Sequence, residues 1–216
     1  MPSVRLLSIT PNYMELLKAA CGKPYGNNVS EKGIKAIIES GHLSVLEHCY
    51  ASFEVKCSVR VLGQLTRHRH LSFTVKSARG SKFDKLVITN GLQEALKKEA
   101  ENQKVVNAAV PRTVKNASAL LEMVALNIYN DLIEQGVSEQ DAAYLLPQGV
   151  ETEMVVTGNF RAWYEYLPKR LCKRAMPEHN RVAARILELL QDNAPEVFER
   201  NFLNCANCKE KSCDFK

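Results

Sequence analysis

A dense group of basic side chains lies between residues 65 and 83, in the segment LTRHRHLSFTVKSARGSKF. The basic residues of this segment are Arg67, His68, Arg69, His70, Lys76, Arg79 and Lys82. Hydroxyl groups stand between them, at Ser72, Thr74, Ser77 and Ser81. Arginine side chains that fork onto phosphate oxygens, together with hydroxyl donors, suit a nucleotide. A solvent-exposed basic loop and a nucleic-acid contact are two other interpretations of the same residues.

The composition makes nucleic acid the weaker interpretation of this basic segment. A single-strand binding surface combines a basic groove with several aromatic side chains for base stacking. Phe73 is the one aromatic residue in the interior of the segment, and the sequence pI is about 8.8. The net charge of +5, from 29 basic against 24 acidic residues, is mild. No nucleic-acid partner is therefore expected, although spacing alone does not separate the three interpretations.

Length and hydropathy indicate a globular protein. The chain has 216 residues, of which 45% are hydrophobic and 25% charged, and this fits a domain with a sizeable core. The N-terminal residues MPSVRLLSIT lack an apolar run of the signal-peptide type, and no run approaches the ~20 residues that a membrane helix needs. A cytoplasmic enzyme or binding protein without a membrane partner is therefore expected.

The basic segment follows an expected strand and an expected helix. Residues 51–57, ASFEVKC, alternate apolar and polar side chains, which predicts a half-buried strand. The apolar face of this strand is formed by Phe53, Val55 and Cys57. Residues 58–66 then take up helical spacing, with Ser58 as the expected N-cap. The basic segment thus begins where this helix ends.

Helices outweigh strands in the rest of the sequence. Further helices are expected over residues 30–41 with Ser30 as N-cap, 113–136, 138–146 with a Ser138–Asp141 cap, 160–167 and 177–191, and a strand over 153–159. The buried stripe expected on the longest helix is Val114, Ala117, Leu121, Val124, Ile128 and Leu132. Because strands do not alternate regularly with helices, the expected fold class is α+β rather than a doubly wound sheet.

A second group of residues with chemical potential lies in GHLSVLEHC, residues 41–49. His42, Glu47 and His48 could suggest a metal site, but the HExxH arrangement that places two histidines on one helix face is absent. Isolated histidines beside a strand are more often hydrogen-bonded structural groups. No metal is expected at these three residues.

The segment RHRHLSFTVKSAR, residues 67–79, fits the pattern R-H-R-x-x-S-x-x-x-x-S-x-R. This pattern resembles the signature of the flavin-dependent thymidylate synthases, also called thymidylate synthase complementing proteins. The segment GHLSVLEH is similar to a family segment G-H-x-S/T-x-x-E-H, and Gln64 stands three residues before the main motif, as in the family. DAAYLLP, ETEMVVTGNFR and KRLCKRA resemble three later family segments in the same order. The resemblance extends from near the N-terminus to about residue 200.

The resemblance implies a fold, an assembly and a reaction. It implies a single α+β domain over residues 1–204, with helices packed on a mainly antiparallel sheet, followed by a cysteine-rich tail over 205–216. It also implies a homotetramer whose active sites lie between subunits and bind FAD. The implied reaction is the reductive methylation of dUMP to dTMP, with methylenetetrahydrofolate as one-carbon donor and NADPH as reductant.

Residue roles follow position by position from the same resemblance. The expected flavin-binding residues are Ser44, Arg67, His68, Arg69, Val75, Asn159, Arg161 and Glu165. The expected nucleotide-binding residues are Gln64, Arg67, Ser77, Arg79 and Arg170. Arg170 is also the expected catalytic residue, because it matches an arginine set against the uracil, where a permanent cation would favour the N3 anion. Ser77 is expected to donate a hydrogen bond rather than to act as a nucleophile, because no base is placed to activate it.

Several positions depart from the family pattern. Glu165 stands where an Asn or His would meet the flavin, Gly80 stands where a tyrosine commonly follows the motif, and Met176, Pro177 and His179 replace the more usual run around Glu178. Ala143 stands where many members carry an arginine, which predicts altered nucleotide recognition unless Lys76 or Arg112 takes its place. Two alternatives therefore stand beside dUMP methylation. They are C5 methylation of UMP or dCMP, and a non-catalytic nucleotide- or nucleic-acid-binding protein on the same scaffold.

The seven cysteines do not suggest a disulfide framework, because their number is odd and they are scattered. The tail CANCKEKSC has short metal-ligand spacing, and Cys172 follows Arg170 by two residues. Cys172, Cys205, Cys208 and Cys213 are therefore predicted to form a tetrahedral zinc site that ties the tail to the segment of Arg170. The alternative is that the tail cysteines are free thiols.

Overall fold

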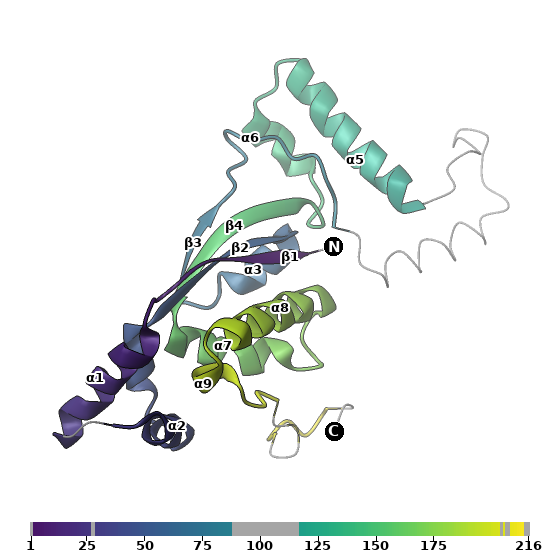
Figure 1. Ribbon diagram of the computed structural model, residues 1–216. Coiled ribbons are helices and arrows are strands. Elements are labelled where there is room, and N and C mark those ends of the chain that lie inside the picture. The colour runs from purple at the N-terminus through teal and green to yellow at the C-terminus, as the bar shows by residue number, and fades with distance from the viewer. Residues whose placement is uncertain (1, 27–28, 88–116, 204, 206–207, 214–216) are drawn as a thin grey trace. The chain divides into compact units, whose positions relative to one another are not determined.

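The computed structural model describes residues 2–26, 29–87, 117–203, 205 and 208–213, with side chains in helix α5 from residue 124 onward. Figure 1 shows the path of the chain. The chain divides into two compact units, each described by itself below. The larger unit comprises residues 2–55, 64–74 and 154–216, and the smaller unit comprises Met1, 56–63 and 75–153.

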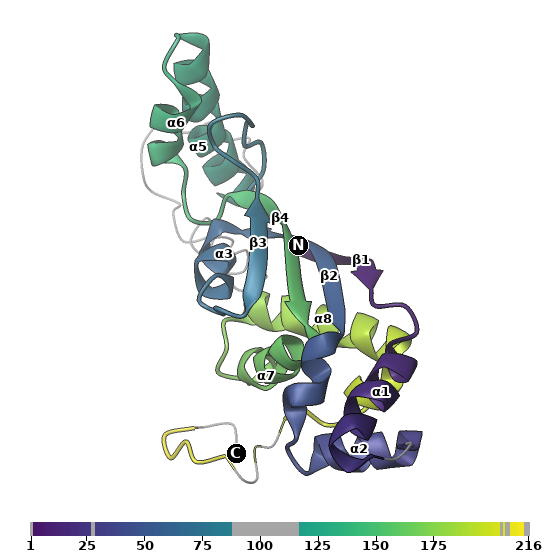
Figure 2. The same cartoon turned by 90° about the vertical axis from the view of Figure 1, so that its left-hand side faces the viewer.

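A four-stranded sheet is the centre of the fold. Its strands are β1 (Ser3–Ile9), β2 (Tyr50–Ser58), β3 (Leu71–Val75) and β4 (Glu151–Asn159), in the order β1-β2-β4-β3. The N–H of Thr10, just after β1, donates to the carbonyl of Tyr50 at the start of β2. The N–H of Phe160, just after β4, donates to the carbonyl of Cys49 just before β2. Each strand end thus meets its neighbour's start, so these pairs are antiparallel, and Figure 2 shows β3 and β4 pointing in opposite directions.

The apolar face that the alternating sequence of β2 predicted is buried. Phe53, Val55 and Cys57 are all fully buried. Trp163 of helix α7 (Phe160–Leu171) packs against this strand, with its ring edge-on to Phe53 at 5.1 Å and its Nε1 donating to the carbonyl of Ala51 at 3.1 Å. The buried face of β2 therefore fixes the position of α7, the helix that carries Arg170.

Helices cover the sheet within the larger unit. They are α1 (Tyr13–Tyr25), α2 (Glu31–Glu39), the 3₁₀ turn η1 (Leu43–His48), α7, α8 (Pro177–Asn193) and α9 (Pro195–Phe198). Helix α7 packs against α8 and η1, while α8 also packs against β1. The arrangement of helices on a mainly antiparallel sheet confirms the predicted α+β class (Figure 1).

The predicted N-cap of α2 is confirmed. The hydroxyl of Ser30 accepts the N–H of Gly33 at 3.2 Å, as an N-cap does. Ile34 and Ile38 of this helix are buried. Gly41 follows the helix with a φ of 90°, a conformation that a residue with a side chain rarely adopts.

The smaller unit contains the start of α3 (Val59–Leu65), α5 (Ala117–Glu134), α6 (Glu139–Ala142) and the 3₁₀ turn η2 (Ala143–Leu145). The predicted caps of α3 and α6 are present, because Ser58 accepts the N–H of Val61 and Ser138 accepts the N–H of Asp141. The core of the unit is formed by Phe83, Leu126, Tyr129, Ala142 and Val150.

The predicted buried stripe of α5 is wrong in part. Val124 and Ile128 are 47% and 48% exposed, whereas Leu126 and Tyr129 face the core. The helix carries apolar side chains on both faces, so periodicity alone does not select the face that packs. Leu132 packs against the core as predicted, Val114 lies outside the described residues, and the side chains of Ala117 and Leu121 are likewise not described.

Among the described helices, none combines the length and the apolar character needed to cross a bilayer.

Candidate active site

Arg170, the predicted catalytic residue, lies in the last turn of α7 and donates three hydrogen bonds. Its Nε donates to Nε2 of His68 at 2.9 Å. Its Nη1 donates to Oε1 of Gln64 at 3.4 Å, and its Nη2 donates to the backbone carbonyl of Gln64 at 3.3 Å. The structure thus brings together, within the larger unit, a residue predicted to bind flavin and two predicted to bind a nucleotide.

The backbone of Arg170 is held from α8. The sequence predicted that this helix ends at Leu167, before Pro168, but α7 continues to Leu171. Asn180 donates from Nδ2 to the carbonyl of Arg170 at 3.0 Å and to that of Leu171 at 2.9 Å. The last carbonyls of a helix have no donor within the helix, so these bonds complete its end. Side chain and backbone of Arg170 are therefore both fixed.

His68 is uncharged at neutral pH. Its pKa is lowered from 6.5 to about 4, chiefly by burial and then by the positive charges of Arg170 and Lys169. The lone pair of its Nε2 is therefore available to accept the N–H of Arg170, and the ring proton lies on Nδ1. The ring of His68 also meets that of Tyr166 edge-on at 4.9 Å.

A second histidine lies behind Gln64 and is fully buried. His179 places Nδ1 3.3 Å from Oε1 of Gln64 and Nε2 3.1 Å from the hydroxyl of Tyr166. Burial, followed by the charges of Arg170 and His68, lowers the pKa of His179 to about 3. The sequence marked position 179 only as a departure from the family, and its role in this network was not predicted.

Two predicted flavin residues of the main motif and one of η1 lie at the surface. Arg67 and Arg69, on either side of His68, are exposed, as is Ser44 in η1. Within the described part of the chain, the side chains of the two arginines form no ion pair. Their positive charges are therefore available to an anionic ligand.

Asn159 and Arg161 start α7 and make local contacts. Asn159 is the N-cap, with Oδ1 accepting the N–H of Ala162 at 2.7 Å. Arg161 donates from Nε to Glu165 at 2.9 Å and from Nη1 to Glu47 at 2.5 Å. Glu165, at a predicted flavin position, thus pairs with a predicted flavin-binding cation.

Three further predicted site residues belong to the smaller unit. Val75 ends β3 and is half-buried. Ser77 and Arg79 are exposed, and the hydroxyl of Ser77 accepts the backbone N–H of Arg79 at 3.2 Å. The serine therefore shapes a turn that leaves the arginine side chain in solvent.

Ala143 has a structural role in the same unit. It begins η2, is half-buried and packs against the core of the smaller unit. Lys76, one candidate to replace a missing arginine, places Nζ 5.0 Å from the centre of the Phe83 ring. Arg112, the other candidate, lies outside the described residues.

The four cysteines of the predicted zinc site do not form one in the described part of the chain. None of Cys172, Cys205, Cys208 and Cys213 forms a disulfide. Among the described residues, no group of three or more His, Cys, Asp or Glu side chains is arranged to hold a metal ion. The tail is instead linked to the end of α7 by polar contacts of Arg174 with Glu210 and Ser212.

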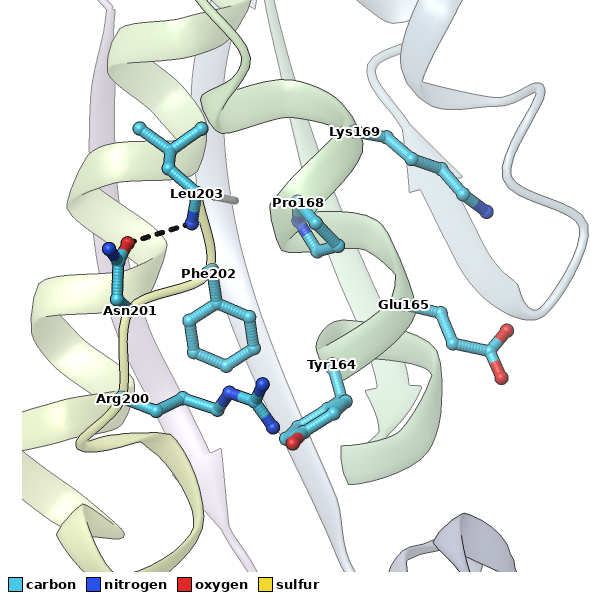
Figure 3. Close-up of a pocket in the computed structure, with 8 residues that line it drawn as sticks. All are labelled: Tyr164, Glu165, Pro168, Lys169, Arg200, Asn201, Phe202 and Leu203. Atoms are coloured by element: carbon cyan, nitrogen blue, oxygen red, sulfur yellow. Dashed lines mark hydrogen bonds between the residues drawn. The ribbon is translucent and has the colours of Figure 1, made fainter. Parts of the chain in front are cut away.

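A pocket of about 640 Å³ lies beside α7 and the segment 200–203 (Figure 3). Its walls are formed by Tyr164, Glu165, Pro168, Lys169, Arg200, Asn201, Phe202 and Leu203. The guanidinium of Arg200 lies 5.0 Å from the Tyr164 ring and 5.6 Å from the Phe202 ring. Glu165 lines this pocket and is also one of the predicted flavin residues. Arg200 was not pointed to by any sequence pattern.

Comparison with known proteins decides the family. Residues 5–196 match the family described as thymidylate synthase complementing protein. The chain belongs to this family. The match covers both the arginine–histidine motif and the whole of α7, so every residue around Arg170 lies within it.

Three proteins named flavin-dependent thymidylate synthase are similar to this member of the family. That of Mycobacterium avium is 32% identical over 199 residues, which cover 87% of this chain and 78% of the relative. That of Saccharolobus solfataricus is 35% identical over 183 residues, covering 81% and 62%. That of Pyrococcus furiosus is 33% identical over 164 residues, covering 74% and 62%. The identification of an enzyme of the thymidylate synthase complementing protein family, made from the motif, is confirmed.

Proposed function

We propose that this chain is an FAD-dependent enzyme that converts dUMP to dTMP, with methylenetetrahydrofolate as one-carbon donor and NADPH as reductant. The observation that carries the proposal is the guanidinium of Arg170, fixed by Gln64 and His68 next to the arginine–histidine motif. The names of the relatives support thymidylate synthesis and a flavin.

Arg170 retains the capacity to bind a pyrimidine. A guanidinium has five N–H groups, and three of them donate to described residues, so two remain for a ligand. C5 of uracil is a weak nucleophile, and its attack on a one-carbon unit requires stabilised negative charge on the ring. A preorganised cation supplies this stabilisation without reorganising in the transition state. A guanidinium group is a permanent cation, so it suits this role.

The described residues also fit a flavin nucleotide. Arg67 and Arg69 are exposed cations suited to diphosphate oxygens, and Asn159 keeps its amide Nδ2 after capping α7. Ser44 offers an exposed hydroxyl. FAD, when bound, would supply the reducing equivalents for the methylation. The sequence contains no G-x-G-x-x-G turn, so a Rossmann-type flavin site is not the source.

A homotetramer with active sites shared between subunits belongs to the same proposal, with residues 1–204 as the catalytic domain. Apolar side chains that one chain leaves exposed support it. On α5, Val124 and Ile128 are 47% and 48% exposed, and Tyr144 of η2 is 86% exposed. A second subunit that covered them would remove this apolar surface from water.

The most specific part of the proposal is the identity of the nucleotide substrate. Ala143 packs into the core of its unit and offers no donor to a phosphate or base. This observation supports UMP or dCMP as alternatives, because a contact made by other family members is missing. The experiment must therefore compare all three nucleotides.

The test starts from the colour of the purified protein. A yellow protein that takes up FAD stoichiometrically supports a flavoenzyme, whereas a colourless protein that does not take up added FAD contradicts the proposal. The second step measures oxidation of the reduced flavin without oxygen, with methylenetetrahydrofolate and dUMP, UMP or dCMP. Oxidation with dUMP supports the stated reaction, and oxidation with UMP or dCMP alone transfers the proposal to that substrate. Nucleotide binding without oxidation would show a non-catalytic binding protein.

A further inference from the structure

We propose that His179 is a positioning residue, which holds the side-chain amide of Gln64 with its oxygen toward Arg170 and its nitrogen toward the nucleotide. The inference rests on the proposed function, because it names a residue that prepares the same site. Among the expected nucleotide-binding residues, the hydrogen bonds of His179 reach Gln64 alone. It acts through Gln64.

The hydrogen bonds of this cluster admit one proton arrangement. Arg170 has only N–H groups to offer, so the atom of Gln64 that faces its Nη1 must be the amide oxygen. The same oxygen lies 3.3 Å from Nδ1 of His179, which must therefore carry the ring proton. Nε2 of His179 is then an acceptor, and the hydroxyl of Tyr166 donates to it over 3.1 Å. The charge on Arg170 thus determines the tautomer of His179.

The reversed amide is disfavoured at its contact with Arg170. With Nε2 of Gln64 in the place of Oε1, an N–H group would face the N–H groups of Arg170. Neither group could accept, so donors would be left unsatisfied in a partly buried place, which is costly. His179 would also have to move its proton from Nδ1 to Nε2 to accept from the reversed amide.

Burial keeps the ring of His179 uncharged, as this role requires. The ring is fully buried, and protonation would add a second cation next to Arg170. Both ring nitrogens have partners, so the neutral ring is satisfied without charge. Its pKa of about 3 places the neutral form throughout the physiological range.

The consequence is a ligand-facing surface made only of donors. The oxygen of Gln64 is occupied by His179 and Arg170, whereas the one contact of its Nε2 with a described residue is a weak one, to Sδ of Met176 at 3.8 Å. Two N–H groups of Arg170 also remain. This surface accepts carbonyl or phosphate oxygens of a nucleotide and rejects a donor group in the same place.

Three substitutions separate positioning from packing. In His179→Asn the amide nitrogen stands near the place of Nδ1 and donates to Gln64, whereas in His179→Gln it stands near Nε2 and in His179→Leu no donor remains. Each FAD-loaded variant is titrated with dUMP, and thermal unfolding is followed in parallel. Positioning predicts that the Leu and Gln variants bind dUMP about 10-fold more weakly, as for one lost hydrogen bond to a charged group. It also predicts that the Asn variant stays within about threefold of wild type.

A purely structural role predicts the opposite order. Leucine brings no polar group of its own into the buried site, so it would then be the best tolerated substitution, and asparagine the worst. Retained dUMP affinity in the Leu variant with loss in the Asn variant overturns the proposal. A double-mutant cycle adds a second criterion. In a Gln64→Ala background, His179→Leu should cause no further loss of affinity, and an undiminished loss there also overturns the proposal.

The closing measurement needs no nucleotide. Nitrogen NMR of histidine labelled with ¹⁵N, assigned with the His179→Asn variant, reports the protonated ring nitrogen at pH 7 in the FAD-loaded protein. The proposal predicts a proton on Nδ1 of His179 in the wild type and its transfer to Nε2 in Gln64→Ala. A proton on Nε2 in the wild type overturns the positioning role. Failure of dUMP to bind, with the predicted tautomer present, contradicts the proposed function instead.

Discussion

Replacing Arg170 with alanine removes the one cation that the account assigns to the chemistry. The substitution deletes two N–H groups available to the pyrimidine and three hydrogen bonds to Gln64 and His68. Losing one preorganised donor at a developing anion typically costs about 3–4 kcal/mol in barrier, or roughly 10²–10³ in rate. Because Arg170 also supplies the charge, the turnover of Arg170→Ala is expected to fall by about 10³-fold or more.

The assay is oxidation of the reduced flavin by dUMP and methylenetetrahydrofolate without oxygen, with FAD affinity measured on the same protein. FAD affinity is expected to change by less than about threefold, because Arg67 and Arg69 carry the expected flavin contacts. Lys169→Ala is the matched control, since it removes an exposed neighbouring cation on the same helix. The control should keep turnover within about threefold of wild type. Turnover of Arg170→Ala within a few-fold of wild type would refute the catalytic role and leave Arg170 a structural residue.

Other expected outcomes concern stability and nucleotide affinity. His68 and His179 have folded-state pKa values of about 4 and about 3, whereas a free histidine titrates near 6.5. The unfolded chain therefore binds more protons below pH 6.5, and urea unfolding should show a free energy of unfolding that falls from pH 7 to pH 5, less steeply in His179→Leu than in wild type. Ala143→Arg should tighten dUMP binding about 10-fold by calorimetry if a cation is missing there, and unchanged affinity would show that packing is its whole role. Gly158→Ala should lower the free energy of unfolding by about 1–3 kcal/mol, because a Cβ would lie 2.3 Å from Cδ2 of Leu71, and an unchanged value would contradict that close approach.

Local patterns in the sequence were sufficient for several elements. The alternation in β2 and the caps of α2, α3 and α6 depend on residues within four positions of each other, and all are confirmed. Strand β3 was not predicted, because hydroxyl and basic residues conceal its alternation inside the motif. The expected end at Leu167 was wrong because α8 supplies Asn180 to complete the helix beyond Pro168.

The candidate site was predictable where a family motif names the residue and not where a contact is distant in sequence. The motif pointed to Gln64, His68 and Arg170 one by one. Their hydrogen bonds join residues 102 to 106 positions apart, and the bond of His179 to Gln64 spans 115 positions. No local pattern encodes such a contact. The zinc prediction shows the converse, because short cysteine spacing in the tail did not bring the thiols together among the described residues.

The central claim is tested most directly by product formation. Purified protein with bound FAD is incubated without oxygen with NADPH, methylenetetrahydrofolate and dUMP. The nucleotides are then separated, and they are identified and quantified by mass spectrometry. The account predicts dTMP in amounts that exceed the enzyme several-fold, and none in the Arg170→Ala variant within the same time. FAD-loaded protein that reduces its flavin but leaves dUMP unmethylated would contradict the account.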